Sequence, residues 1–387
     1  MRTAWSPHRG RRLAPSPALL APGILATAVL ATAALSVAAG HSVTVASTAT
    51  ITTIQDKTTT PKAPGWRVIT TIGPYNQSVS GTLTASSATS AWSVWTGTHF
   101  TAVERLAGTK WARVPLPAEL TGYARSAVAF GGDSATDFWL FSSHRTTEAL
   151  RFTGTKWTLA PIPSWVLGHR SGGGGPTAST AVLGPDNVWV FSLGAGNYAA
   201  HYNGHAWTKV RLPATPDEVS TVGADDIWAL AGSVALHWNG RSWTTIKIPV
   251  AAGKPPESVG SLTATGPKSA WVLRTILIPG PRTDAEVLHW NGTEWLAVAG
   301  APADIIGSIV PDGSGGLWAT GVDINPGGFS NFYHLANGHW TTVSPPEGVF
   351  SQAQENLTWI PGTRSLWGTA AGMSNKGNSG VLIKYGP

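Results

Sequence analysis

The sequence contains no cysteine and few charged residues, and the lack of cysteine excludes several kinds of site. Without Cys the chain can form no disulfide, no thiolate metal site and no Cys nucleophile, and it can carry no lipid on an N-terminal Cys. Charged residues make up 12% of the chain, whereas hydrophobic residues make up 42%. The core can therefore be large. Gly and Pro are abundant, at 45 and 28 residues, which fits many short strands joined by turns.

Acidic residues are missing from the first 40 positions, and this skews the formal net charge of +6. Arg2, Arg9, Arg11 and Arg12 lie in that segment, so residues 41–387 carry 22 basic and 20 acidic side chains. Such a nearly neutral body lacks the basic footprint of a nucleic-acid-binding protein. We expect no nucleic-acid partner.

The N-terminus has the pattern of an export signal. A basic segment precedes an apolar run from Leu19 to Ala39, which ends in small residues suited to cleavage. A run of this length could also remain as a membrane anchor, but Pro22 and the many Ala residues favour cleavage. We predict a signal peptide (or anchor) over 1–40 and a disordered Thr/Ser-rich spacer over 41–65. The protein is expected to be secreted, touching a membrane only if the first segment is uncleaved.

A repeat dominates the rest of the chain. Its clearest mark is a Trp inside a short apolar strand, which we call the marker Trp. The seven marker residues are Trp92, Trp139, Trp189, Trp228, Trp271, Trp318 and Trp367. After each of the first six, a hairpin leads to a second Trp and then to a Pro, which closes the strand because it cannot donate to a ladder. One unit is thus four short strands in about 45 residues, the size of one β-propeller blade.

The seventh unit lacks its fourth strand, and a matching strand stands at the start of the repeat region. The run Trp66-Arg67-Val68-Ile69 has the pattern of a fourth strand, but no unit precedes it. Joining it to Leu382–Tyr385 completes the blade and removes the open sheet edge. We predict an all-β fold, a seven-bladed β-propeller over 66–387, closed by an N-terminal strand that completes the last blade.

The repeat resembles tectonin-type propeller repeats over about residues 66–387. The residues that carry the resemblance are Trp243 with Ile246, the run Asp226-Ile227-Trp228-Ala229, and His237-Trp238-Asn239-Gly240 leading to Trp243. The Gly-Val-Asn that such repeats often have after the marker Trp is absent here. The resemblance implies a lectin-like, carbohydrate-binding function.

One polar position recurs in all seven third strands. It is filled by Arg105, Arg151, His201, His237, His289, His334 and Lys384, provided that Asn337 takes the place of a turn Gly in the sixth unit. Equivalent positions in neighbouring blades lie about 10 Å apart, too far for shared ligands of one Zn ion at about 2 Å. We interpret these side chains and the marker Trp residues as structural, and expect no metal and no cofactor.

Irregular loops are expected to gather on one face of the disc, where a ligand would bind. The candidate ligand-binding residues are Tyr75, Tyr123, Trp165, His169, Arg170, Arg282, Asp284, Asp323, Asn325, Phe329, Asn375 and Lys376. Solvated loops with no ligand are the other interpretation. We predict a monomeric, non-catalytic binding module or scaffold for a glycan or a cell-surface protein. The alternative is a secreted hydrolase or lyase with its site on the same face, but no catalytic residue can be named.

Overall fold

The computed structural model describes residues 65–75, 79–97, 100–168, 178–192, 196–250, 257–277, 283–302, 307–322, 330–346, 349–350, 356–374 and 377–387. These residues belong to one compact unit, Thr60–Pro387. The expected signal peptide and residues 41–64 of the expected spacer lie outside them, so both stay predictions. Within the described residues, no helix is both long enough and apolar enough to cross a membrane.

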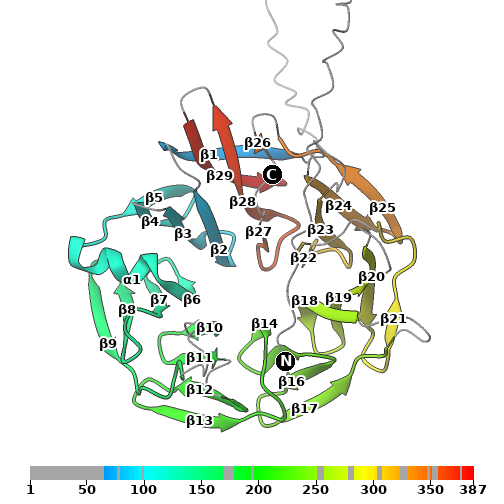
Figure 1. Ribbon diagram of the computed structural model, residues 1–387, viewed down its shortest axis with the longest axis horizontal. Coiled ribbons are helices and arrows are strands. Elements are labelled where there is room, and N and C mark those ends of the chain that lie inside the picture. The colour runs from blue at the N-terminus through cyan, green and yellow to red at the C-terminus, as the bar shows by residue number, and fades with distance from the viewer. Residues whose placement is uncertain are drawn as a thin grey trace, which may run out of the picture. The chain divides into compact units, whose positions relative to one another are not determined.

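Seven antiparallel sheets stand in a ring (Figure 1), and their innermost strands line a central channel. Six sheets have four consecutive strands each, and the seventh combines the C-terminal strands with the first strand of the chain. The predicted seven-bladed propeller is therefore confirmed. We number the blades 1 to 7 from the sheet β2–β5 onward.

The strands are grouped by their place in the blade. The innermost strands are β2 (Ser80–Ser87), β6 (Ala127–Ser134), β10 (Ala178–Gly184), β14 (Glu218–Gly223), β18 (Glu257–Gly266), β22 (Ile309–Pro311) and β27 (Asn356–Trp359). The second strands, which hold the marker Trp residues, are β3 (Ser90–Gly97), β7 (Asp137–Ser142), β11 (Asn187–Ser192), β15 (Asp226–Ala231), β19 (Ser269–Leu277), β23 (Leu317–Val322) and β28 (Leu366–Ser374).

The outer half of each blade follows the same plan. The third strands are β4 (Phe100–Ala107), β8 (Glu148–Thr153), β12 (Tyr198–Tyr202), β16 (Val234–Trp238), β20 (Thr283–Trp290), β24 (Ser330–Ala336) and β29 (Gly377–Tyr385). The outermost strands are β5 (Lys110–Val114), β9 (Trp157–Pro161), β13 (Trp207–Arg211), β17 (Trp243–Lys247), β21 (Trp295–Ala297), β25 (His339–Val343) and β1 (Trp66–Tyr75). In blade 7 a short strand, β26 (Val349–Phe350), also pairs with β28.

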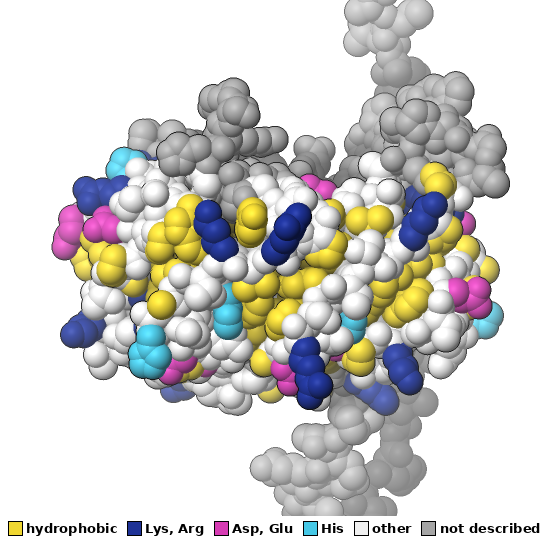
Figure 2. Space-filling view, turned by 90° about the horizontal axis from the view of Figure 1, so that it is seen from below, with side chains coloured by type: hydrophobic (Ala, Val, Ile, Leu, Met, Phe, Trp, Pro, Cys, Tyr) yellow, Lys and Arg dark blue, Asp and Glu magenta, His cyan; other side chains and the backbone are white. Residues whose placement is uncertain are grey.

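The core lies between the blades. The marker Trp residues are at most 4% exposed, and each apolar cluster joins the facing sheets of neighbouring blades, as where Trp139 of blade 2 meets Val188 and Val190 of blade 3. Burying one such side chain contributes about 1.5–3 kcal/mol or more. On the rim shown in Figure 2, Lys and Arg side chains are spread among apolar ones and form no single basic patch among the described residues.

The ring is closed as the sequence predicts. Strand β1 pairs with β29, and the register places Trp66 opposite Tyr385. The Trp66 ring also packs on blade 6, with ring centroids 4.5 Å from Phe332 and 5.5 Å from Trp318. The first and last described strands therefore share one sheet, and their contacts extend to the blade next to it.

Strand direction sorts the connections onto two faces. One face holds the connections between first and second strands and those between third and fourth strands. We call it the turn face, and its longest connection is the segment 360–365 between β27 and β28. The other connections share the loop face and include 115–126 and, in their described parts, 162–168 and 344–346. On the turn face Asn337 has φ 53°, the left-handed conformation that the alignment of the sixth unit requires.

A short helix replaces one expected loop. Residues 115–126 contain η1 (Ala118–Leu120) and α1 (Thr121–Arg125), where the sequence predicts an irregular segment. Leu120, Tyr123 and Ala124 share one side of this turn and pack into the seam between blades 1 and 2. Their burial explains why a helical turn forms here.

Candidate functional site: the central channel

Most of the predicted ligand-binding residues lie outside the described part of the chain. These are His169, Arg170, Arg282, Asp323, Asn325, Phe329, Asn375 and Lys376. The backbone places Tyr75 at the loop-face end of β1 and Asp284 near the loop-face end of β20. Their assignment to a binding site stays a prediction.

Tyr123 is described, and its side chain is only 3% exposed. Its hydroxyl donates to Glu148 Oε2 at 2.6 Å, and the Arg145 guanidinium, 3.2 Å from the same oxygen, lies 5.6 Å from the Tyr123 ring centroid. Burial and the neighbouring Glu148 raise the pKa of the Tyr123 phenol. In this arrangement Tyr123 ties α1 to β8 and presents little surface to a ligand.

Trp165 is half-buried on the loop face, in a small aromatic patch. The Lys209 ammonium lies 5.0 Å from the Trp165 ring centroid and 5.6 Å from that of Tyr198, which is 39% exposed. A cation held over two aromatic rings contributes about 0.5–1 kcal/mol at an exposed site. The patch is accessible, but none of its three residues lines either of the two cavities described below.

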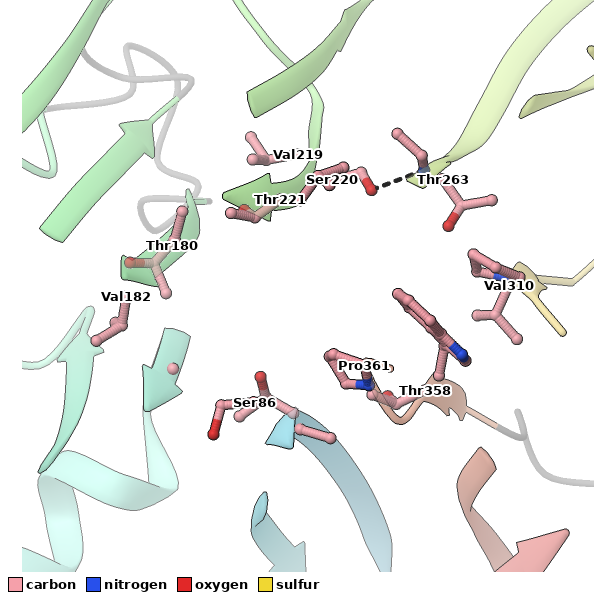
Figure 3. Close-up of a pocket in the computed structure, with 18 of the residues that line it drawn as sticks. Ser86, Thr180, Val182, Val219, Ser220, Thr221, Thr263, Val310, Thr358 and Pro361 are labelled. Atoms are coloured by element: carbon pink, nitrogen blue, oxygen red, sulfur yellow. Dashed lines mark hydrogen bonds between the residues drawn. The ribbon is translucent and has the colours of Figure 1, made fainter. Parts of the chain in front are cut away.

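A cavity of about 500 Å³ occupies the central channel. Residues from all seven innermost strands line it, and Figure 3 shows Ser86, Thr180, Thr221, Thr263 and Thr358 around the open centre. Hydroxyls on a ring of rigid strands present donors and acceptors from several directions. The channel thus combines a fixed shape with uncharged polar groups.

The strand register identifies one ring of small residues in the wall of the channel. The residues directly opposite the marker Trp residues are Thr84, Gly131, Ala181, Ser220, Thr263, Val310 and Thr358. All are small enough for seven strands to approach the axis. The backbone N–H of Ala264 donates to Ser220 Oγ at 3.0 Å, which leaves the Ser220 O–H free to donate. Thr358 Oγ1 donates to the Leu83 carbonyl of blade 1 at 3.2 Å.

One aromatic residue interrupts this small-residue lining. The next position along each innermost strand holds Ala85, Gly132, Val182, Thr221, Ala264, Pro311 and Trp359. The Trp359 indole N–H donates to the Thr363 carbonyl at 2.8 Å, which fixes the ring near the turn face. Gly313 of blade 6 allows this approach, because a Cβ there would overlap both the Thr363 carbonyl and the Trp359 indole. A fixed aromatic plane therefore borders the channel beside Pro361.

A second cavity, of about 380 Å³, lies nearer the loop face. Its lining takes the first halves of β2, β6 and β10, whereas the channel cavity takes their second halves, and Thr84 and Thr180 line both. The innermost strands run from the loop face to the turn face, so the two cavities follow one another along the channel. Arg125, at the end of α1, lines the second cavity.

Asp133 is the one charged residue that lines the channel cavity in the described part of the chain. Burial raises the pKa of the nearby Asp137, the Arg151 guanidinium at 3.0 Å opposes the shift, and Asp133 adds to it. Asp133 Oδ1 and Asp137 Oδ2 are both buried without a hydrogen-bond partner among the described residues. The turn-face half of the channel is therefore a poor place for an anion.

The recurring imidazoles do not line either cavity. His201, His237, His289 and His334 each stack on the marker Trp of their own blade, with ring centroids 4.2–4.4 Å apart. Each also bonds a polar residue near the start of the second strand or in the turn before it. The described residues contain no group of three or more His, Asp or Glu that could hold a metal ion.

Sequence reasoning did not single out Trp359. Its signal was present, because Trp359 belongs neither to the marker series nor to the series that ends each hairpin. A Trp outside both series has no packing role assigned by the repeat, and this one borders the channel.

No protein-family model and no curated protein sequence matches this chain. Solved structures do match it. An extracellular domain assigned to a hybrid two-component system of B. thetaiotaomicron has a TM-score of 0.52 and 14% identity, covering 82% of this chain and 39% of the other. A puromycin-hydrolyzing peptidase of Mycobacterium tuberculosis has a TM-score of 0.52 and 13% identity, covering 79% and 53%. The chain spans about half or less of these two structures, and at such identity the likeness shows the fold alone.

Lectins are also among the matched propellers. The SapL1 lectin in complex with alpha methyl fucoside has a TM-score of 0.41 and 14% identity, covering 71% of this chain and 98% of the lectin. This score is too low to support a shared function.

Proposed function

We propose that this chain is an extracellular, non-catalytic binding protein that takes a saccharide in its central channel. The observation that carries the proposal is the pairing of a fixed indole, Trp359, with a surrounding ring of Ser and Thr hydroxyls. Sugar rings have apolar C–H faces that stack on an aromatic plane, and their hydroxyls exchange hydrogen bonds with small polar side chains. The export-signal pattern of the N-terminus supports the extracellular location.

The rigidity of the lining supports affinity. The innermost strands are tied across blade seams, as where Glu218 accepts the backbone N–H groups of Ser261 and Leu262 at 2.9 and 2.8 Å. Side chains held on such strands lose little conformational freedom when a ligand binds. The channel is therefore preorganised, and little binding free energy is lost in ordering its side chains.

A glycan array probed with the labelled full chain tests this proposal, followed by calorimetry on the strongest neutral hit. Trp359→Ala should weaken binding of that hit by about 1–3 kcal/mol, because the stacking surface is lost. Trp165→Ala is the matched control, since it removes a half-buried Trp outside the channel and should leave affinity unchanged. Thermal unfolding checks that both variants fold.

Three outcomes would contradict the proposal. One is that no saccharide binds, and a second is that Trp165→Ala, and not Trp359→Ala, removes binding, which would move the site to the loop face. The third is release of new reducing ends from the bound glycan, abolished by Asp133→Asn. That result would replace binding by hydrolysis.

A further inference from the structure

The two halves of the channel differ in charge, and this difference bears on whether a neutral or an acidic saccharide binds there. Arg125 is the one charged residue among those described around the second cavity, and its side chain is exposed. It makes no ion pair with an acidic side chain in the described ranges. A guanidinium with free donors at the entrance of a cavity is suited to a carboxylate, which it can bind through two parallel hydrogen bonds.

The surroundings of Arg125 add neutral donors and acceptors. Thr82, Thr96, Ser179 and Thr180 line the same cavity. The Thr180 hydroxyl donates to the Trp189 carbonyl at 2.7 Å, so toward a ligand it can only accept. Val94 and Phe130 supply apolar surface in the same lining, against which the C–H face of a sugar ring can pack. One acidic group among sugar hydroxyls fits this composition.

The other end of the channel has the opposite preference. Asp133 lines the channel cavity, and its buried Oδ1 has no partner in the described part of the chain. Asp133 lies on β6, and Arg125 lies just before this strand, eight positions away. Eight residues of extended chain span at most about 26 Å. A saccharide of several units can reach both cavities, and a second acid at the Asp133 end would be repelled.

We infer that the ligand is an acidic oligosaccharide with its acidic sugar at the loop-face end, on Arg125, and neutral sugars on Trp359 and toward Asp133. This inference rests on the proposed function. It adds the chemical class of the ligand and the direction in which the ligand lies in the channel.

The test uses matched sets of tetrasaccharides built on galactose, glucose and mannose. Each set contains a neutral form, a form with one terminal uronic acid and a form with a uronic acid at every sugar. The full chain should bind the single-acid form of the preferred set about tenfold more tightly than the neutral form, the effect of a hydrogen bond to a charged group. The fully acidic form should bind less tightly than the single-acid form.

Two substitutions locate the preference. Arg125→Gln should remove the tenfold preference and leave binding of the neutral form unchanged. Arg241→Gln is the matched control, because Arg241 is an exposed arginine on a turn-face hairpin that lines neither cavity; it should preserve the preference. Asp133→Asn should bring the fully acidic form closer to the single-acid form.

The failures are distinguishable. Equal binding of neutral and single-acid forms, or a preference that survives Arg125→Gln, overturns this inference and leaves the proposed function standing. Absence of binding by every member of every set overturns this inference, and only the absence of any saccharide hit on the glycan array overturns the proposed function as well.

Discussion

At the residue scale, the repeated imidazole shows how one position adapts to its partner. His334 bonds the carboxylate of Asp312 at 3.1 Å, whereas His201 bonds the amide oxygen of Asn187 at 3.0 Å. Burial alone would raise the pKa of Asp312, but hydrogen bonds from His334, from the Ser314 hydroxyl and from two backbone N–H groups hold it well below its usual range. Burial lowers the pKa of His201 and of His289, whose partner is the hydroxyl of Ser269 at 3.2 Å.

This lowered pKa predicts a pH effect. A half-buried His with a pKa below its unfolded value of about 6.5 binds its proton less readily when folded. The unfolded state therefore takes up more protons, and stability falls as the pH drops below about 6.5. Asn187→Asp places a carboxylate beside the His201 ring and should raise the pKa of His201, which reduces the loss of stability at low pH. Ring titration by NMR measures the shift, with His289 as the unchanged reference. A His201 titration that does not move would contradict this account.

The comparison of sequence and structure is also clearest for single residues. Trp66 and Tyr385 could be paired from the sequence, because a strand without a unit and a unit without a strand must meet. Asn337 could be placed in a left-handed turn by alignment. Trp359 could not be assigned to the channel. A repeat predicts the features that its copies share, whereas a binding site arises where one copy differs from the others. The fate of Tyr123 was hidden for another reason: its burial depends on a helical turn that docks between two blades.

At the scale of elements, the seam between blades 7 and 1 depends on two glycines. Gly81 on β2 and Gly380 on β29 both face the ring of Trp95, which is fully buried. A Cβ at either position would overlap the ring. These glycines therefore let a large side chain fill the seam between blades 7 and 1.

We predict that Gly380→Ala lowers the free energy of unfolding by about 1–3 kcal/mol, the usual cost of overpacking a tight core. Gly122→Ala is the control, because open space surrounds Gly122 in α1 and Ala favours a helix. Urea unfolding followed by Trp fluorescence measures both. Equal stability of the Gly380→Ala variant and the native protein would show that the seam is looser than the structure indicates.

Strand β1 closes blade 7, and its removal should open the ring. A fragment of residues 60–387 retains β1, whereas a fragment of residues 79–387 exposes the edge of β29. Exposed strand edges pair with other chains, so the shorter fragment should form oligomers or aggregates in size-exclusion chromatography with light scattering. A monomeric shorter fragment with an unchanged Tm would contradict the role of β1.

At the scale of the whole molecule, the chain divides its tasks between repeat and exception. The marker Trp residues, the stacked imidazoles and the Asn–Gly turns recur and build a rigid ring. The channel is where copies differ: Trp359 in blade 7, Asp133 in blade 2 and Arg125 beside it supply an aromatic plane and two opposite charges. The pattern of the sequence predicts the ring, but only the packing of seven strands around one axis brings these exceptions to a common space.

Photo-crosslinking with a diazirine-labelled form of the strongest glycan-array hit, followed by peptide mapping, tests the central claim most directly. The account predicts that the label attaches to peptides of the innermost strands, such as 80–87, 178–184 and 356–359, and that unlabelled glycan competes it away. Labelling confined to the outermost strands or to the loop face, with none on the innermost strands, would contradict it.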